Sequence, residues 1–268
     1  MHKPSHLPKA LALAGLLTLA APIAFAQAFD AVRLAGGSAD KDRGSVGLAV
    51  VAGMAYQGAD ERRTLLLPGI DYQWRNGWFA GTRNGIGYNF GQNRELQYGL
   101  RITADFGRDE SRSNALRGMG DIDPRPEFGA FLNYAVDKEI TLTSSLRYGS
   151  GNDNNGMVID LGAGYSTKLS PLWRLGFGAS MTLANDEYMQ SYFGVSTAQA
   201  ASSGYAAYRP EFGLRDIRAN ASLSYLITPS ITILTTVSVS SLQGDAKDSP
   251  LTRQATSTTG VVAVTYEF

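Results

Sequence analysis

The sequence predicts an all-β protein, an antiparallel transmembrane β-barrel of about 12 strands. Three observations lead to this prediction: an export signal at the N-terminus, apolar residues that recur at every second position, and an aromatic residue at the C-terminus. Of the 268 residues 44% are hydrophobic, and 24 basic residues balance 24 acidic ones. Because no part of the chain is strongly basic, we expect no nucleic-acid partner.

Residues 1–26 have the features of a cleaved secretory signal peptide. Lys3 and Lys9 precede an apolar run over residues 11–24, and Ala24-Phe25-Ala26 has the small-x-small form of a cleavage site. This run is shorter than the roughly 20 apolar residues of a membrane-spanning helix. The sequence therefore predicts a signal peptide over residues 1–26, a short periplasmic segment over residues 27–43 and an outer-membrane barrel over residues 44–268.

The residue inventory excludes several kinds of chemistry. The chain has no cysteine, and its two histidines, His2 and His6, both lie in the predicted signal peptide. Thiolate metal sites and nucleophiles activated by histidine are therefore absent from the mature chain. The adjacent carboxylates Asp186 and Glu187 are more typical of a solvated loop than of an acid–base pair. We expect no enzyme, no cofactor and no resident metal.

The strands are predicted from alternation. Between residues 45 and 56 the even positions are apolar, from Val46 to Tyr56, and the odd positions are mostly small. A period of two over about ten residues is typical of a strand with two different faces. Similar alternation predicts further strands at residues 66–75, 78–83, 85–90, 95–107, 127–134, 139–148, 159–168, 173–181, 217–227, 231–239 and 262–268.

Alternation alone does not distinguish a membrane barrel from a secreted β-sandwich. A sandwich buries the apolar face, whereas a membrane barrel turns it toward lipid. Export, aromatic residues at strand ends and the terminal residues Tyr266 and Phe268 favour the barrel. A terminal Phe that closes an alternating strand looks like the signal that outer-membrane proteins present to the barrel-assembly machinery. The expected partners are therefore this machinery and outer-membrane lipid.

The strand count follows from the lengths of the connections. Bacterial barrels have even strand numbers, short periplasmic turns and longer outer loops. Short turns at residues 75–77, 136–138, 169–171 and 228–230 alternate with long connections at residues 108–126, 149–156, 185–209 and 243–257. Three passes between residues 78 and 107 give twelve strands, and a barrel of ten strands, in which residues 78–90 are irregular, is the alternative.

The predicted lumen is close to neutral. Seven acids and seven bases occupy inward positions, which favours ion pairs that plug the barrel over a selectivity ring of one sign, although a narrow pore remains the alternative. The residues are Asp71, Glu95, Asp105, Glu127, Glu139, Asp160, Glu267, Arg75, Arg83, Arg101, Arg147, Lys168, Arg174 and Arg218.

Three segments of the C-terminal third resemble those of one family. They are Tyr188–Val195, Ser202–Tyr208 and Leu242–Pro250, and weaker agreement extends upstream through Gly85–Tyr88 and Leu116–Asp121. Together with the terminal Tyr266-Glu267-Phe268, this order and spacing resembles the MltA-interacting protein (MipA)/OmpV family of outer-membrane proteins. The residues that carry the resemblance are Tyr188, Tyr192, Phe193, Gly194, Ser203, Gly204, Tyr208, Gly244, Asp245, Ser249 and Pro250.

The resemblance implies an outer-membrane β-barrel with no catalytic residues. For some members it implies a scaffold that joins a membrane-bound lytic transglycosylase to a murein synthase. The first functional hypothesis is therefore a cell-envelope scaffold, and the alternative is a small passive channel or an adhesin. We expect the aromatic motif residues to lie at the membrane interface or to pack inside a long loop, and Gly194 and Gly204 to adopt a positive φ.

The C-terminal strand provides the first testable prediction. Deletion of Phe268, or its replacement by Asp, should lower the amount of heat-modifiable barrel in the outer membrane, because this residue closes the assembly signal. Semi-native electrophoresis of purified outer membranes measures that amount. A soluble β-protein would hardly change, since terminal residues are usually frayed, and a normal barrel yield from the deletion would contradict the membrane assignment.

Overall fold

The computed structural model of the chain describes residues 41–268, apart from residues 92 and 94. The predicted signal peptide at residues 1–26 and most of the predicted periplasmic segment at residues 27–43 lie outside the described residues.

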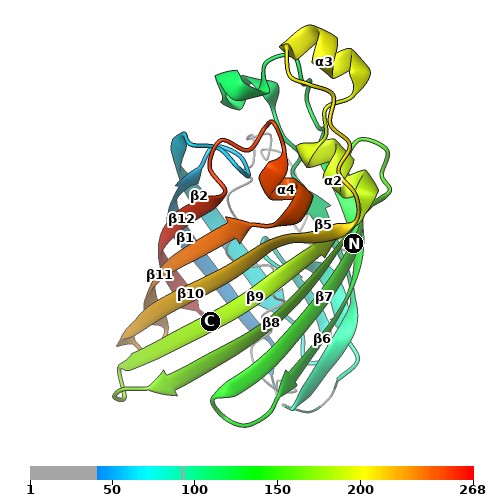
Figure 1. The fold of residues 1–268 in the computed structure, drawn as a ribbon. Helices are drawn as coiled ribbons and strands as arrows, with labels where there is room; N and C mark the ends of the chain where they lie inside the picture. The colour runs from blue at the N-terminus through cyan, green and yellow to red at the C-terminus, as the bar shows by residue number, and fades with distance from the viewer. Residues whose placement is uncertain (1–40, 92, 94) are drawn as a thin grey trace, which may run out of the picture.

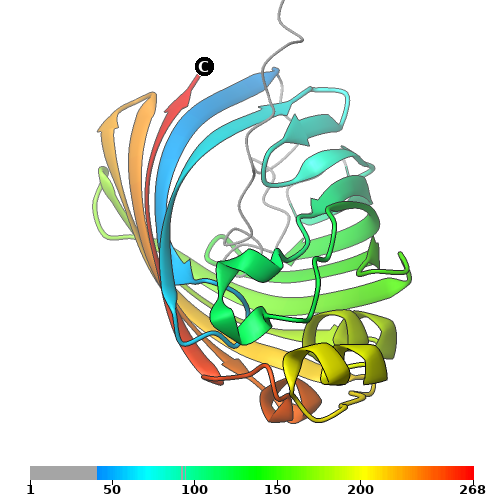
Figure 2. The same cartoon turned by 90° about the horizontal axis from the view of Figure 1, so that it is seen from above.

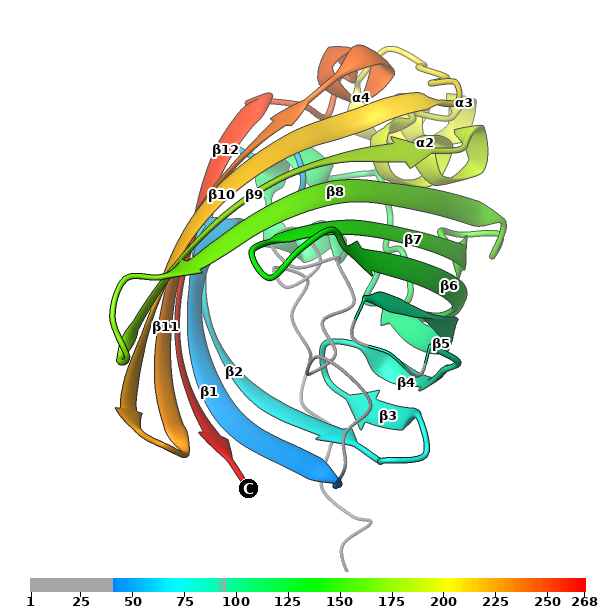
Figure 3. The ribbon, with the colours of Figure 1, turned by 90° about the horizontal axis from the view of Figure 1, so that it is seen from below.

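Twelve antiparallel strands form a closed barrel in which each strand pairs with its neighbours in sequence and β1 pairs with β12 (Figures 1 and 3). The strands are β1 (Arg43–Met54), β2 (Arg62–Gln73), β3 (Trp78–Gly81), β4 (Gly85–Asn89), β5 (Leu96–Asp105), β6 (Arg125–Ala135), β7 (Ile140–Ser150), β8 (Gly156–Lys168), β9 (Trp173–Ala184), β10 (Gly213–Thr228), β11 (Ile231–Leu242) and β12 (Thr256–Glu267).

This topology confirms the prediction of twelve strands, and the alternative of ten is wrong. Residues 78–90 form two short strands, β3 and β4, that are part of the closed sheet. Several strands begin earlier than predicted. The largest differences are at β12, which starts at Thr256 rather than Val262, and at β2 and β10, which start at Arg62 and Gly213 rather than at residues 66 and 217. The connection predicted at residues 185–209 contains two helices, α2 (Asp186–Phe193) and α3 (Thr197–Ser203), and a third, α4 (Gly244–Asp248), follows β11.

The apolar face of the alternation is the outer face of the barrel. On β5 Leu100 is 59% exposed while its neighbour Arg101 is 6% exposed, and Val46, Leu48 and Val50 on β1 are likewise exposed. Exposed apolar side chains cover the wall, as expected of a surface that faces lipid. None of the helices in the described residues is long and apolar enough to span a membrane.

Aromatic rings gather at one end of the barrel, where the short connections lie. We call this end the turn end and the opposite one, with the long connections, the loop end. Neighbouring rings are in edge or tilted contact with centroids 4.5–6.0 Å apart. This belt matches the aromatic girdle of a membrane interface. Its pairs are Tyr72–Trp74, Trp78–Tyr88, Tyr88–Phe90, Phe90–Tyr98 and Trp173–Tyr225.

The short strands β3 and β4 leave part of one edge of β2 without a neighbour. On the side away from β1, no residue of the described chain pairs with residues 62–69 of β2. The Ile70 amide, the last on this edge with a partner, donates to the hydroxyl of Thr82, and Pro68 has no N–H to leave unpaired. Because alternate residues of a strand address the same neighbour, Pro68 removes one of the amide groups that this edge would otherwise leave unpaired.

The connection between β5 and β6 arches over this unpaired edge. It contains two short helical turns, η1 (Glu110–Arg112) and η2 (Asn114–Leu116). Ala115 and Leu116 of η2 are buried against Met54, Ala55 and Tyr56 at the end of β1. The loop end is therefore continuous above the gap in pairing.

The C-terminus is held in the barrel seam. The Phe268 amide donates to the Gly44 carbonyl at 2.9 Å, and the Gly44 amide donates to the Phe268 carbonyl at 3.0 Å. The Phe268 ring lies so close to Gly44 that a Cβ on this residue would collide with it. The terminal residue is therefore an integral part of the closure between β1 and β12.

The two faces of β5 can be distinguished by site-directed labelling. Since the chain has no native cysteine, a fluorophore can be placed at Leu100→Cys or at Arg101→Cys alone. A lipid-soluble quencher should affect the label at position 100 and spare position 101, because only the first faces lipid. Equal access of a water-soluble quencher to both labels would contradict the face assignment.

Candidate functional site: the lid over the lumen

The candidate site is the closure of the lumen at the loop end. It consists of a layer of buried charged side chains inside the barrel, the helix α2 above this layer, and the connections that hold α2. Figure 2 shows the helices together along one side of the mouth and the η1–η2 connection lying over it. We refer to the helices and these connections as the lid.

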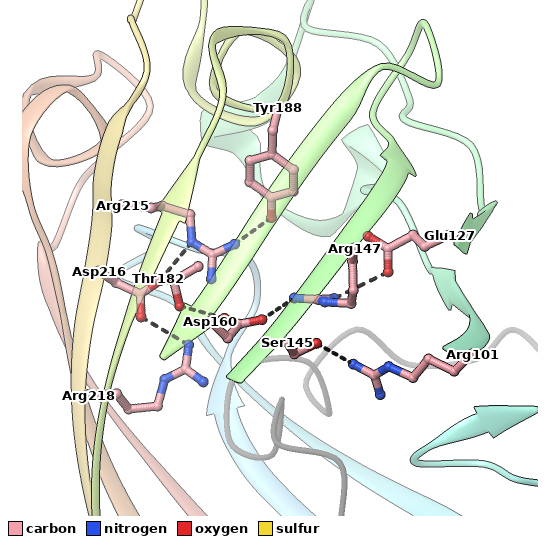
Figure 4. Close-up of polar contacts among 10 residues, drawn as sticks. All are labelled: Arg101, Glu127, Ser145, Arg147, Asp160, Thr182, Tyr188, Arg215, Asp216 and Arg218. Atoms are coloured by element: carbon pink, nitrogen blue, oxygen red, sulfur yellow. Dashed lines mark hydrogen bonds and ion pairs between the residues drawn. The ribbon is translucent and has the colours of Figure 1, made fainter. Parts of the chain in front are cut away.

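The first part of the charged layer spans β6 to β9 (Figure 4). The Arg147 guanidinium donates to Glu127 at 3.2 Å and to Asp160 at 3.1 Å, and the Thr182 hydroxyl donates to the second oxygen of Asp160 at 2.8 Å. Nearby, Arg101 donates to the Ser145 hydroxyl at 2.9 Å. The Glu127 side chain is 1% exposed, so these ion pairs lie in a region of low dielectric, where removal of one partner is costly.

The second part lies on β10 and reaches α2. Asp216 accepts hydrogen bonds from Arg215 at 2.7 Å and from Arg218 at 3.0 Å. Arg215 also donates to the Tyr188 hydroxyl at 2.9 Å (Figure 4). A shift in the strand register between Leu214 and Asp216 places Arg215 and Asp216 together inside, although adjacent residues of a regular strand face opposite sides. The register shift thus concentrates charge directly beneath the lid.

Helix α2 forms where the sequence provides a cap and an apolar stripe. The Asn185 side chain accepts from the Tyr188 amide, and Asp186 and Glu187 occupy the first turn, where they suit the helix dipole. The buried face is formed by Tyr188, Met189, Tyr192 and Phe193, which pack on strand residues such as Val158 and Ala184. The rings of Tyr188 and Tyr192 stack with centroids 4.5 Å apart.

Three further contacts fix α2 over the lumen. The Tyr192 hydroxyl donates to Asp105 at the end of β5. The buried Arg108 donates to the Tyr192 carbonyl at 2.7 Å, and the Ser249 hydroxyl donates to the Phe193 carbonyl at 2.6 Å. The helix is therefore attached to β5, to the β5–β6 connection and to the β11–β12 connection at once.

Burial of the lid changes the acidity of its side chains. Desolvation raises the pKa of Tyr188 to about 12 even though the charge of Arg215 acts in the opposite direction. Burial, and then the nearby Asp105 carboxylate, raise the pKa of Tyr192 well above its ordinary value. Burial lowers the pKa of Arg108. Both tyrosines therefore stay neutral hydrogen-bond donors at physiological pH.

The next layer joins α3 to the β5–β6 connection. Ser196 and Gln199 form a capping box at the start of α3, and the helix ends at Gly204, whose φ is +80°. Gln199 donates to the Met119 carbonyl and Ser202 donates to the Gly118 carbonyl, each at 2.7 Å. Two segments that separately resemble the family therefore meet in space.

The remaining motif residues hold α4 against the connection between α3 and β10. The Tyr208 hydroxyl donates to the Asp245 carbonyl at 2.9 Å, and the Asp245 carboxylate accepts from the Glu211 amide at 2.7 Å. Gly244, at the start of α4, has a φ of +47°. Pro250 follows Ser249 directly after the helix, where a proline helps to end it.

The positions of the motif residues in the lid confirm part of the prediction made for them. Tyr188, Tyr192 and Phe193 pack inside the long connection rather than at the membrane interface, and Gly204 has the expected positive φ. The prediction for Gly194 is wrong, since its φ is −79°. This glycine is needed for space, because a Cβ would collide with the side chain and carbonyl of Gln190. Ser203 donates to the Gln199 carbonyl within α3. Asp186 and Glu187 are exposed, as expected of a solvated pair.

Sequence reasoning missed three charged residues of this site, Arg108, Arg215 and Asp216. The predicted strand starts at Ile217, so Arg215 and Asp216 lie outside it, whereas β10 starts at Gly213. The Arg-Asp-x-Arg pattern over residues 215–218 was the available signal, since it places opposite charges close together at a strand start. Arg108 had no such signal, because its partner is a carbonyl 84 residues away in sequence.

A cavity of about 1220 Å³ lies below the charged layer, in the turn-end half of the lumen. Asp160, Ser145 and Arg218 of the layer line its inner end, and residues 136–139 of the β6–β7 turn line its outer end. We call it the vestibule. Among the described residues, no cluster of three or more acidic side chains is arranged to hold a metal ion.

A closed barrel of twelve strands with an apolar outer face and a charged lumen defines an outer-membrane β-barrel protein. The family model of the MltA-interacting protein MipA matches residues 46–268. The chain therefore belongs to the MipA family. This family and this fold are those of outer-membrane barrels rather than of enzymes, and the protein is assigned to the outer membrane.

Solved structures of outer-membrane proteins are similar in fold. The KdgM porin has 12% identity and a TM-score of 0.45, with 84% of this chain and 99% of that chain covered. The NanC porin has 12% identity and a TM-score of 0.46, with 82% and 98% covered. A bacterial polysaccharide outer membrane secretin has 10% identity and a TM-score of 0.49, with 84% and 98% covered. No curated protein matches this sequence.

The charged layer generates a prediction about stability. Asp216→Asn should lower the free energy of unfolding by about 3 kcal/mol, because it removes the carboxylate shared by two buried guanidinium groups. Asp71→Asn is the matched control, since its partner Arg83 is 39% exposed and such pairs contribute about 0–1 kcal/mol. Urea unfolding in detergent micelles measures both values. Equal losses in the two variants would contradict the role given to the charged layer.

Proposed function

We propose that this outer-membrane barrel is a scaffold of the cell envelope, and that its partner is the lytic transglycosylase to which the family name refers. The observation that carries the proposal is the closure of the lumen. A charged layer and a buried helix occupy the loop end, and residues 41–268, as far as the structure describes them, place no catalytic set beside them. Such a protein is better suited to hold a partner than to conduct solutes or to catalyse a reaction.

The proposed orientation places the turn end in the periplasm. Short turns face the periplasm in bacterial barrels, and a transglycosylase that acts on murein is found on that side. The proposal includes cleavage of the signal peptide after Ala26, so that residues 27–43 also face the periplasm. A murein synthase is the second partner that the family resemblance suggests, and the barrel-assembly machinery and outer-membrane lipid are the partners expected of any such barrel.

A small channel is the second candidate, and the vestibule of about 1220 Å³ is the observation that favours it. In this structure the vestibule ends at the charged layer. Conduction would therefore require α2 and several buried ion pairs to move, which makes a permanently open channel the weaker candidate. An adhesin, the other alternative, would use the exposed outer surface of the lid.

Site-specific cross-linking tests the scaffold and its orientation together. Lys138 in the β6–β7 turn and Lys247 in α4 are both exposed, at opposite ends of the barrel. A photo-cross-linker attached to Lys138→Cys should capture the transglycosylase in intact envelopes, whereas the same reagent on Lys247→Cys, the matched control, should not. Absence of the transglycosylase from the Lys138 adducts, or its capture from position 247, would contradict the proposal.

A further inference from the structure

The vestibule has a floor made of backbone. Gly162 and Gly164 of β8 and Gly176 and Gly178 of β9 all face inward, on two paired strands. At Gly164 a Cβ would meet no atom closer than 3.8 Å. The other three glycines are covered by polar side chains of neighbouring strands, since Thr143, Ser222 and Asn220 occupy the place of their Cβ atoms. Glycine therefore lets these polar groups approach the backbone of the floor closely.

The walls around this floor carry hydroxyl and amide groups. Gln97, Asn133, Ser166, Asn220 and Ser222 line the vestibule. The large apolar residues of the same strands belong to the opposite face, since Tyr165 is 40% and Phe177 49% exposed on the lipid side. An amphipathic peptide would lack apolar pockets in such a site, whereas a ligand rich in hydroxyl and amide groups would find partners throughout.

Two buried hydroxyls beside the vestibule lack a hydrogen-bond partner. Thr236 and Ser238 of β11 are each 3% exposed, and neither side-chain oxygen has a partner in the part of the chain that the structure describes. In the strand register Thr236 lies opposite Ser222, and Ser238 lies opposite Asn220. Buried hydroxyls are normally satisfied, but these two lie behind the lining residues of β10 and do not themselves line the vestibule.

Charges of both signs complete the lining. Arg174 donates to the Ser166 hydroxyl at 3.2 Å and forms no ion pair with any acid among the described residues. Glu139 accepts from the Thr167 hydroxyl at 2.6 Å. A sugar hydroxyl both donates and accepts hydrogen bonds, so it can use a carboxylate and a guanidinium on either side of one ring.

We propose that the vestibule is a binding site for an amino-sugar glycan, the chemistry of the murein backbone, which enters from the turn end and stops at the charged layer. This inference rests on the proposed scaffold function, because it places the substrate of the transglycosylase beside the barrel that binds this enzyme. The volume of about 1220 Å³ slightly exceeds that of common small-molecule sites, roughly 300–1,000 Å³, and suits a short oligosaccharide. The blind inner end makes the site one for binding rather than passage.

Calorimetric titration of the purified barrel with a soluble tetramer of N-acetylglucosamine tests this proposal. The detergent must have no sugar headgroup, since such a headgroup would compete. Gly164→Phe fills the floor and should weaken the apparent affinity by at least about tenfold, which corresponds to 1.4 kcal/mol. Ala221→Phe is the matched control, because Ala221 of β10 faces lipid and does not line the vestibule, and it should bind like the unmodified barrel. Heat-modifiability confirms that each variant is folded.

Asn220→Ala provides a second variant that removes polar groups without adding bulk, and it too should weaken binding. Failure of the tetramer to bind the unmodified barrel at millimolar concentration, or equal binding by the Gly164→Phe and Ala221→Phe variants, would overturn the proposal. Cross-linking from Lys138 then separates the two proposals. Capture of the transglycosylase without glycan binding would reject the glycan site alone, and loss of this capture in Gly164→Phe would show that the vestibule holds a protein segment instead.

Discussion

The structure depends on the charged layer that crosses the lumen beneath the lid. Arg147 bridges two carboxylates on neighbouring strands, Asp216 receives two guanidinium groups, and the hydroxyls of Thr182 and Tyr188 complete the contacts. Buried ions are tolerated only when partners replace the water they lose. Because these partners lie on five adjacent strands and on α2, the layer fixes the relative positions of barrel wall and lid, and it ends the vestibule at its inner side.

The charged layer requires a barrel wall whose apolar side chains face outward and whose polar side chains face inward, the reverse of a soluble protein. Lipid takes the place of a core around the outer wall, so apolar side chains face outward and the inner face is available for charge. A shift of register by one residue would move Arg101 to the lipid side and Leu100 into the lumen. The closure of β1 on β12, with Phe268 against Gly44, supplies the backbone hydrogen bonds that these two strands need in a membrane.

Sequence alone was sufficient for the barrel because its dominant signal is local. Leu100 beside Arg101, repeated along each strand, defines the two faces, and connection lengths then define the strand count. The site was predicted less completely, because its contacts join distant parts of the chain. The motif residues Tyr188 and Tyr192 were identified, but the partners Arg215 and Arg108 depend on a register shift and on a carbonyl far away in sequence. The reason predicted for Gly194 is wrong. A glycine is required there because Gln190 approaches it closely, and not because its φ is positive.

We infer that the charged layer and α2 close the lumen. Single-channel recording of the purified barrel in planar bilayers tests this closure. We expect no sustained conductance steps from the unmodified protein across the range of membrane potentials that a bilayer tolerates. Sustained open-channel steps, present in the unmodified barrel and absent from bilayers without protein, would contradict the closure and favour the channel.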